Sequence, residues 1–338
     1  MIDCTQYIKA KFTPIEQDKD PEKWLELRTT GIGGSDTGAI LGLNPYASPL
    51  TVYLSKKNVE GFKGNAATEW GHILEKPIMQ KASEELGIEI VSVPGMYTSL
   101  EVPFMNANLD GICHAQNKVT IGGETVEGVG GYEIKTSTKG DGFSDDEIPD
   151  SYYCQVQHYM AVTGLPWFIL TAFFMTSRTA RHYIIKRNDD FIYTKLIPAE
   201  KDFWENFVLA NNPPEPLGID SESEYVANLN IADEVVLDAE TEDLIAQRME
   251  IQMQIKDLEQ KENALKDSIL LKLSILSHSD ENTAEKVSGS GERFKLSYNL
   301  QKKVSVDTDA LKKSGLFDNY KKESSYRILR ISEKKSAN

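Results

Sequence analysis

Three residues near the middle of the chain constrain its fold most strongly. Asp110 follows one strand-like stretch, and Glu133 and Lys135 stand two residues apart in a later segment, GYEIK. Residues two apart on a β-strand project from the same face, so Glu133 and Lys135 point one way and Ile134 points the other. Asp110, at the end of the preceding strand, is then placed to meet Glu133. The pattern predicts a sheet with two carboxylates and one ammonium group on the same face.

This grouping suits one kind of chemistry. Two carboxylates at hydrogen-bonding distance repel each other unless a cation lies between them. Oxygen-only ligands suit Mg2+, which keeps several waters for a phosphate and a nucleophile. Lys135 can orient or help to deprotonate the attacking water, or stabilise charge on the phosphate. The group therefore predicts metal-assisted phosphodiester hydrolysis. Alone it is unspecific, because a solvated strand face with Glu-x-Lys has the same pattern.

Two helices add polar residues, each with a plainer structural explanation beside the functional one. Glu75 lies on the helix expected over 67–86 and can supply another metal carboxylate, or it is a surface residue of an amphipathic helix. Gln155 and Tyr159 are four apart and so share one face of the helix that ends at Gly164. There they can position the metal-bound water and a phosphate. The alternative is a first helical turn with one exposed glutamine.

Arg28 and Ser35 flank the glycine-rich segment GIGG, and Ser35 or Asp36 is a plausible N-cap of the short helix that follows. Backbone N–H groups, a hydroxyl and a guanidinium together make a phosphate pocket. Such a segment is also commonly only a turn. The sequence therefore leaves both interpretations open for Arg28 and Ser35.

Residues 21–217 have the pattern of one α/β domain. We expect the 67–86 helix to bury one side, which carries Trp70, Ile73, Leu74, Ile78 and Met79. The stretches expected to form helices are 21–31, 35–42, 48–58, 67–86 and 150–164, with a strand meander over 88–137 and a pair of buried strands at 167–177 and 180–188.

The remainder of the chain has a different character. A Pro-rich patch at 211–224 leads into a long helical pattern over 237–277, in which apolar residues recur every seventh position. Arg248, Glu262 and Lys272 interrupt the apolar lines, which favours an antiparallel helical arm or hairpin over a strict coiled coil. Strand-like alternation returns at 292–300, 302–307 and 326–332, around a short helix at 309–315. The predicted domains are a core at 1–217, an acidic linker and helical arm at 218–280, and a small α+β segment at 281–338.

Composition limits the class of protein. The chain is 40% hydrophobic and 26% charged, without an apolar run of about 18 residues, so we expect no membrane span. Its start lacks the layout of a signal peptide. Cys4, Cys113 and Cys154 are far apart, and we interpret them as reduced thiols rather than a disulfide framework or a zinc site. We therefore expect a cytoplasmic protein.

The net charge of −15 argues at first against a polyanionic substrate. The charge is segregated, however. Residues 220–259 carry a net charge of −10, from twelve acidic residues and two basic ones, whereas residues 301–338 carry +5, from ten basic and five acidic ones. A locally basic groove within an acidic shell is compatible with this distribution, so the net charge does not exclude DNA.

Five motifs in order resemble those of YqaJ-like phage recombinase nucleases, relatives of the lambda-type exonuclease in the PD-(D/E)XK nuclease superfamily. The resemblance covers about residues 21–185. The motifs are RTTGIGGSDTGAILGLNPYASP from Arg28, EWGHILEKP from Glu69, NLDG from Asn108, YEIKTS from Tyr132 and QVQHYMAVTG from Gln155.

This resemblance implies a central mixed β-sheet flanked by helices and an Mg2+-dependent exonuclease, with Mn2+ as a substitute metal. It implies 5′-to-3′ degradation of one strand of linear double-stranded DNA, which leaves 3′ overhangs for a single-strand annealing protein. By motif, the metal ligands are Glu75, Asp110, Glu133 and the Ile134 carbonyl. The catalytic residues are Asp110, Glu133, Lys135 and Gln155, Tyr159 completes a QxxxY pattern, and Arg28 and Ser35 grip the 5′-phosphate.

The family also implies a homo-oligomer, a ring-shaped trimer, and a bacterial host cytoplasm if the gene is of phage or prophage origin. Residues 219–338 have no obvious counterpart in the lambda-type enzyme, which puts that assembly in doubt. Two alternatives remain open on the same fold: a structure-specific or nicking endonuclease, and a non-catalytic DNA- or protein-binding module.

Overall fold

The computed structural model describes residues 7–16, 19–59, 66–140, 142–229, 231, 234–277, 286–301 and 304–322. Contacts divide the chain into two units, Met1–Asn230 and Ile231–Asn338. The first unit extends beyond the predicted boundary at 217 and includes a further helix, α8. Within the described residues, no helix is long and apolar enough to cross a membrane.

The first unit alternates helices and strands along the chain. Asp20 caps the first helix by accepting a hydrogen bond from the Lys23 backbone N–H, and Pro21 occupies its first turn. Its elements are β1 (Ala10–Thr13), α1 (Pro21–Thr29), β2 (Ile32–Gly33), α2 (Gly34–Ile40), α3 (Pro49–Lys56), α4 (Ala66–Leu86), β3 (Glu89–Val91), β4 (Met96–Ser99), β5 (Met105–Ala107), β6 (Gly111–Ile121), β7 (Glu124–Ser137), α5 (Asp150–Thr163), β8 (Trp167–Phe174), β9 (Thr179–Lys186), α6 (Asp189–Phe191), the π-helical turns η2 (Ile192–Leu196) and η3 (Trp204–Leu209) on either side of α7 (Ile197–Phe203), and α8 (Asp220–Ala227).

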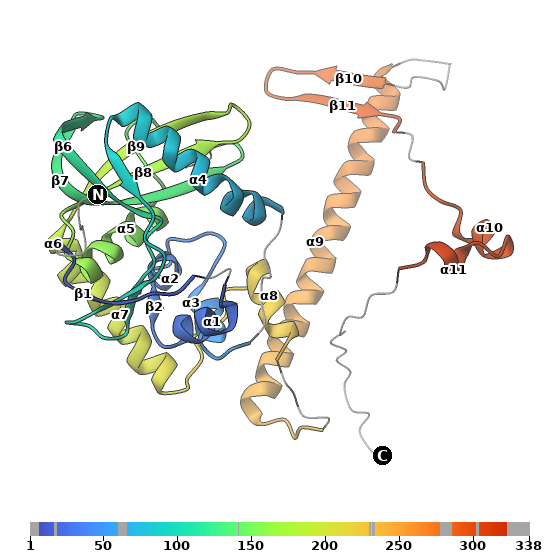
Figure 1. Ribbon diagram of the computed structural model, residues 1–338. Helices are drawn as coiled ribbons and strands as arrows, with labels where there is room; N and C mark the ends of the chain where they lie inside the picture. The colour runs from blue at the N-terminus through green and yellow to red at the C-terminus, as the bar shows by residue number, and fades with distance from the viewer. Residues whose placement is uncertain are drawn as a thin grey trace. The chain divides into compact units, whose positions relative to one another are not determined.

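A five-stranded mixed sheet forms the centre of this unit (Figure 1). Its strand order is β3-β6-β7-β8-β9, and β7 pairs with β8 in parallel while the other neighbours are antiparallel. A tight turn at Gly122 and Gly123, both at positive φ, joins β6 to β7. Helix α5 connects the parallel strands β7 and β8. The central mixed sheet flanked by helices, expected from the resemblance, is confirmed.

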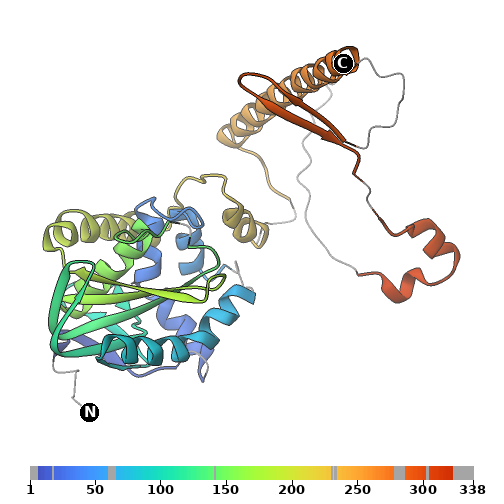
Figure 2. The ribbon, with the colours of Figure 1, turned by 90° about the horizontal axis from the view of Figure 1, so that it is seen from above.

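Two helices cover opposite faces of this sheet, and Figure 2 shows α4 along one of them. Ile78 and Ala82 of α4 pack with Tyr132 and Ile134 of β7. On the other face, residues of α5 pack with β8 in a separate cluster. Because side chains alternate along β7, Glu133 and Lys135 lie on the α5 side. The alternation predicted for this strand is confirmed.

The segment over 88–137 does not form the predicted simple meander. Strands β4 and β5 leave the central sheet and join a second, four-stranded sheet of order β1-β4-β5-β2, in which the short β2 runs parallel to β5. The two sheets thus share one segment of the chain, and the turn between β5 and β6 carries Asp110 from one sheet to the other.

The predicted buried side of α4 is only partly correct. Ile78 is 6% exposed, but Trp70 and Ile73 are 53% and 54% exposed. The apolar cluster against the sheet is built from the second half of the helix, from Leu74 onward. Trp70 and Ile73, in the first half, are not part of that cluster.

The second unit contains one uninterrupted helix, α9 (Ala239–Ser277), in place of the predicted hairpin alternative. A hairpin of β10 (Lys286–Ser290) and β11 (Lys295–Asn299) follows, then α10 (Thr308–Lys313) and α11 (Phe317–Tyr320). Residues 304–307 form no strand, contrary to the prediction for 302–307, and the strand predicted at 326–332 lies outside the described residues. The apolar residues of α9 at the heptad positions remain exposed, Leu244 at 60% and Leu258 at 62%.

Candidate active site

Asp110 and the β7 residues Glu133, Ile134 and Lys135 form one hydrogen-bonded group. The Ile134 backbone N–H donates to Asp110 Oδ2 at 2.7 Å, and Lys135 Nζ donates to Glu133 Oε1 at 2.7 Å. Strand β6 begins at Gly111 opposite Tyr132, which brings the preceding residue, Asp110, beside the two charged β7 side chains. The Glu133 side chain is only 4% exposed and that of Lys135 19%. The structure therefore unites the residues of the central motif.

The charges in this group are unbalanced. Burial and the neighbouring Glu133 raise the pKa of Asp110 well above its ordinary value. Burial also raises the pKa of Glu133, although Lys135 opposes that effect. The two carboxylates overcome the effect of burial on Lys135 and raise its pKa, so the amine stays charged. One ammonium group faces two carboxylates, and a further cation would stabilise both ionised acids.

Helix α5 supplies a polar pair from the opposite side. Gln155 Nε2 donates to Glu133 Oε1 and lies 2.7 Å from Tyr159 Oη as well. Burial and Glu133 raise the pKa of Tyr159 well above 10, so the phenol keeps its proton. The shared helical face predicted for Gln155 and Tyr159 is confirmed. The other oxygen of Glu133, Oε2, is buried without a hydrogen-bond partner.

Glu75 borders the same cavity from α4, but its carboxylate is occupied. His72 Nδ1 lies 3.0 Å from Glu75 Oε1, one helical turn away. In the side-chain arrangement of the described residues, no three His, Cys, Asp or Glu groups are gathered closely enough to hold a metal ion. The Glu75 side chain is 40% exposed, so rotation away from His72 meets little packing. Glu75 still contributes to the raised pKa of Asp110 and Glu133 across the cavity.

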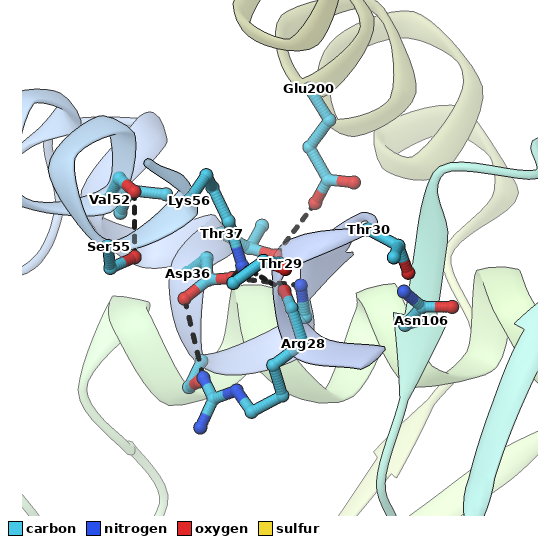
Figure 3. Close-up of polar contacts among 12 residues, drawn as sticks. Arg28, Thr29, Thr30, Asp36, Thr37, Val52, Ser55, Lys56, Asn106 and Glu200 are labelled. Carbon is cyan, nitrogen blue, oxygen red and sulfur yellow. Dashed lines mark hydrogen bonds and ion pairs between the residues drawn. The ribbon is translucent and has the colours of Figure 1, made fainter. Parts of the chain in front are cut away.

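The glycine-rich segment places Arg28 beside α2. Arg28 Nη2 donates to Ser35 Oγ at 3.2 Å and lies 3.6 Å from Asp36 Oδ1. Gly33, rather than Ser35 or Asp36, is the N-cap of α2, and Asp36 turns back to accept from the Gly33 N–H at 2.9 Å. Lys56 Nζ donates to Asp36 Oδ2 at 2.6 Å (Figure 3). Burial opposes the effect, but Lys56 and Arg28 lower the pKa of Asp36.

A cavity of about 250 Å³ brings all the predicted site residues together. They line it from α1, α2, α4, α5 and the central sheet. The predicted residues on its wall are Arg28, Ser35, Glu75, Asp110, Glu133, Ile134, Lys135, Gln155 and Tyr159.

Sequence reasoning missed other residues on the wall of this cavity, namely Trp24, His72, Asn106 and Asn108. Trp24 precedes Arg28 by one helical turn, and Asn108 directly precedes the Leu-Asp-Gly motif, so both spacings held a usable signal. Tyr152 was missed as well: its ring centre lies 5.0 Å from Lys135 Nζ and contributes a cation–π contact. Asn106 had no such signal, because β5 reaches the cavity only through the second sheet.

Comparisons with known proteins agree with these motifs. Residues 23–166 match the model of the YqaJ-like viral recombinase domain. The protein YqaJ of Bacillus subtilis (strain 168) is 26% identical over 270 residues, which are 77% of this chain and 81% of that protein. A protein of African swine fever virus is 34% identical over 100 residues, 28% of each chain. A crystal structure of an alkaline exonuclease from Laribacter hongkongensis is similar with a TM-score of 0.43, 18% identity, and coverage of 56% of this chain and 94% of that one. Residues 23–166, which match the model of the YqaJ-like viral recombinase domain, contain every residue of the cavity motifs.

Proposed function

We propose that the chain is an Mg2+-dependent exonuclease that degrades one strand of linear double-stranded DNA from its 5′ end and leaves 3′ overhangs. The observation that carries this proposal is the buried group of Asp110, Glu133 and Lys135. In it, two carboxylates with raised pKa values meet one ammonium group, and one carboxylate oxygen has no partner. Groups with strongly perturbed pKa values in a cavity are candidates for a functional site.

The residues present fit a hard divalent cation. Glu133 Oε2 is buried and unpartnered, and Asp110 Oδ2 accepts only one backbone hydrogen bond. The donors are oxygen atoms, which Mg2+ prefers, and Mn2+ accepts the same ligands. Asp110, Glu133 and the Ile134 carbonyl would hold the ion, joined by Glu75 after it leaves His72. When bound, the ion would polarise the phosphodiester and lower the pKa of a water.

The other residues on the wall act on the substrate. Lys135 keeps its proton and stabilises charge that develops on the phosphate. Gln155, held between Glu133 and Tyr159, presents its amide to the same region and orients a water or a phosphate oxygen. These are positioning and electrostatic roles, which commonly account for a large share of a nuclease's rate.

Dependence on a DNA end rests on the other wall of the cavity. Arg28 and Ser35 are hydrogen-bonded to each other and line the cavity that Glu133 lines. A guanidinium and a hydroxyl at this position bind a terminal 5′-phosphate and place the first phosphodiester at the carboxylates. The recombinase description of residues 23–166 supports the further proposal of a single-strand annealing partner. From the resemblance to lambda-type exonucleases we also propose a homo-oligomer, with a trimer expected.

Cleavage of a linear duplex with 5′-phosphate ends tests this function. We expect shortening in Mg2+ and none in EDTA, poor cleavage of dephosphorylated ends, and resistance of covalently closed circles. Efficient cutting of closed circles would instead support an endonuclease of the same fold. Binding of DNA without cleavage in either Mg2+ or Mn2+ would support a non-catalytic module.

Lys135→Ala separates catalysis from binding. We expect it to lower kcat by about 10²–10⁴-fold and to leave duplex affinity nearly unchanged. Lys139→Ala is the matched control, because Lys139 is an exposed lysine four residues further along and does not border the cavity. Unchanged turnover of Lys135→Ala would remove Lys135 from the mechanism.

A further inference from the structure

Behind the cavity lies a chain of buried polar side chains that the proposed reaction does not use. Thr37 of α2, His158 of α5 and Glu200 of α7 each have no exposed surface. Thr37 Oγ1 donates to Glu200 Oε1 at 2.7 Å, and His158 Nδ1 lies 2.7 Å from the same oxygen. Figure 3 shows Glu200 reaching from its helix to Thr37. One carboxylate oxygen thus joins three helices.

The partners of the two ring nitrogens of His158 indicate where its protons lie. The Asn106 carbonyl, 2.9 Å from His158 Nε2, can only accept, so Nε2 carries a proton. The contact between Nδ1 and Glu200 holds a second proton. Burial opposes it, but Glu200 raises the pKa of His158, which favours the doubly protonated ring. Removal of either partner leaves a buried group unpaired, so the link resists opening.

Two of the three helices that the link joins, α2 and α5, also carry residues of the cavity wall, as does β5. Helix α2 carries Ser35, α5 carries Gln155 and Tyr159, and β5 carries Asn106, whose carbonyl accepts from His158. Helices α2 and α5 pack so closely that a methyl group added at Gly34 would overlap the Tyr159 ring. We therefore infer that the hydrogen bonds of Thr37, Glu200 and His158 help to determine the position of Ser35 relative to Tyr159.

The metal side of the cavity is anchored differently. Asp110 and Glu133 are held by β7, Lys135 and Gln155. The side-chain hydrogen bonds described for Thr37 and Glu200 go to each other and to His158, and none reaches β6 or β7. A change in this link is therefore expected to move the phosphate-binding side of the cavity and to leave the carboxylates in place.

We propose that Thr37, Glu200 and His158 form a positioning unit that holds Ser35 and Arg28 at the distance from α5 needed to recognise a 5′-phosphate. This inference rests on the proposed function. The three residues determine the preference for phosphorylated ends, while the β7 residues determine metal affinity. They are positioning residues, because none of them reaches the cavity itself.

Thr37 offers a matched pair of substitutions in the full-length chain. Thr37→Val keeps the shape and loses the donor, whereas Thr37→Ser keeps the donor. Fluorescence anisotropy in Ca2+ measures the Kd for short duplexes with a 5′-phosphate or a 5′-hydroxyl. We expect Thr37→Val to weaken binding of the phosphorylated duplex about tenfold without changing binding of the hydroxyl duplex, and Thr37→Ser to bind both as the wild type does.

Three further measurements separate positioning from general destabilisation. Glu200→Gln is expected to lose the same preference and to convert His158 from its doubly protonated form to a neutral ring, as seen by NMR of the histidine nitrogens. Mg2+ affinity by calorimetry should remain unchanged in Thr37→Val and Glu200→Gln. Tyr183→Phe, which removes a partly buried hydrogen bond to the Ser144 carbonyl away from the cavity, is the control and should change neither quantity.

The outcomes distinguish a failure of the positioning role from a failure of the proposed function. A wild-type preference for phosphate that persists in Thr37→Val overturns the positioning role, as does an equal loss of phosphate and Mg2+ binding. A wild-type protein with no preference for phosphorylated ends overturns the phosphate site of the proposed function and this inference with it.

Discussion

Asp110 and Glu133 are carboxylates on the same cavity, and Lys135 is the cation that Glu133 binds. Burial, then the charge of Glu133, raises the pKa of Asp110 well above its ordinary value. A carboxyl group whose pKa is higher in the folded than in the unfolded state costs stability at neutral pH, and the cost disappears as the pH falls through the folded value. The metal-free site is thus strained in a way that a bound cation relieves.

Asp110→Asn is therefore expected to stabilise the metal-free protein. The amide removes the buried charge, and its oxygen can still accept from the Ile134 N–H. We expect the Tm in EDTA to rise by a few degrees and the further rise on addition of Mg2+ to disappear, as measured by calorimetry. Asp145→Asn is the control, since the Asp145 side chain is 90% exposed and should leave the Tm nearly unchanged. A lower Tm for Asp110→Asn would show that the carboxylate stabilises the fold.

Whereas the buried Asp110 carboxylate lowers the stability of the metal-free protein, Lys56 raises stability because it forms an ion pair with the buried Asp36. Its side chain is 3% exposed and donates to Asp36 and to the Arg28 carbonyl. We expect Lys56→Met to cost about 3–5 kcal/mol of unfolding free energy, because it leaves Asp36 buried without its nearest partner. Urea unfolding at neutral pH measures this loss. Lys57→Met, which loses a hydrogen bond to the Val208 carbonyl and a cation–π contact with Tyr53, should cost only about 1–2 kcal/mol.

The lowered pKa of Asp36 adds a pH dependence to that comparison. The stability from an acid with a depressed folded pKa is present above its unfolded value and is lost as the pH falls through the folded one. The difference between wild type and Lys56→Met should therefore be full at neutral pH and shrink once the pH is well below 3.8, the ordinary value for Asp36. A difference that stays constant into that acid range would exclude the Lys56–Asp36 ion pair as its source.

At the scale of helices and strands, the sequence predicted which nearby residues share a face of the same helix or strand. The alternation at Glu133 and Lys135 and the four-residue spacing of Gln155 and Tyr159 both follow from backbone geometry. The exposure of Trp70 was not predictable, because the helical pattern does not show which apolar side chains the rest of the fold will cover. The bond between His158 and Glu200 joins residues 42 apart and requires the folded arrangement of α5 and α7.

The close contact between α2 and α5 depends on two glycines of α2, Gly34 and Gly38. The local sequence pattern did not predict this contact. A methyl group at Gly38 would lie 2.8 Å from the Ser151 Cβ and 3.0 Å from its Cα, so backbone would have to move. We expect Gly38→Ala to cost about 1–3 kcal/mol and to weaken binding of 5′-phosphorylated duplex, because α2 shifts away from α5. Gly42→Ala tests the same substitution where no atom lies within 4 Å, although its positive φ adds its own strain. Equal loss of duplex binding in both variants would argue against the close contact as the cause.

At the scale of the whole molecule, the two units differ in what holds them together. Every buried hydrophobic residue among those described lies in Met1–Asn230, where the three core clusters are found. In the second unit, α9 exposes Ile251 by 55% and Leu265 by 67%. Hydrophobic burial dominates the stability of a folded domain. The described part of the second unit therefore has little of its own to stabilise a cooperative fold.

A chain that ends after Asn230 tests how far the site depends on the second unit. All residues of the cavity wall precede that point, as does Glu222, which accepts from Ser48 and from the Leu217 and Gly218 N–H groups and so fastens α8 to α3. We expect the shortened chain to keep the Tm of the main calorimetric transition and to cleave short duplexes with unchanged kcat. A chain that ends at 217 should instead be less stable, because it lacks Glu222. If instead kcat falls while the Tm is retained, the second unit contributes to catalysis through assembly or DNA contact. The part of the acidic stretch beyond residue 230 and the basic stretch at 301–338 then become the segments to test next.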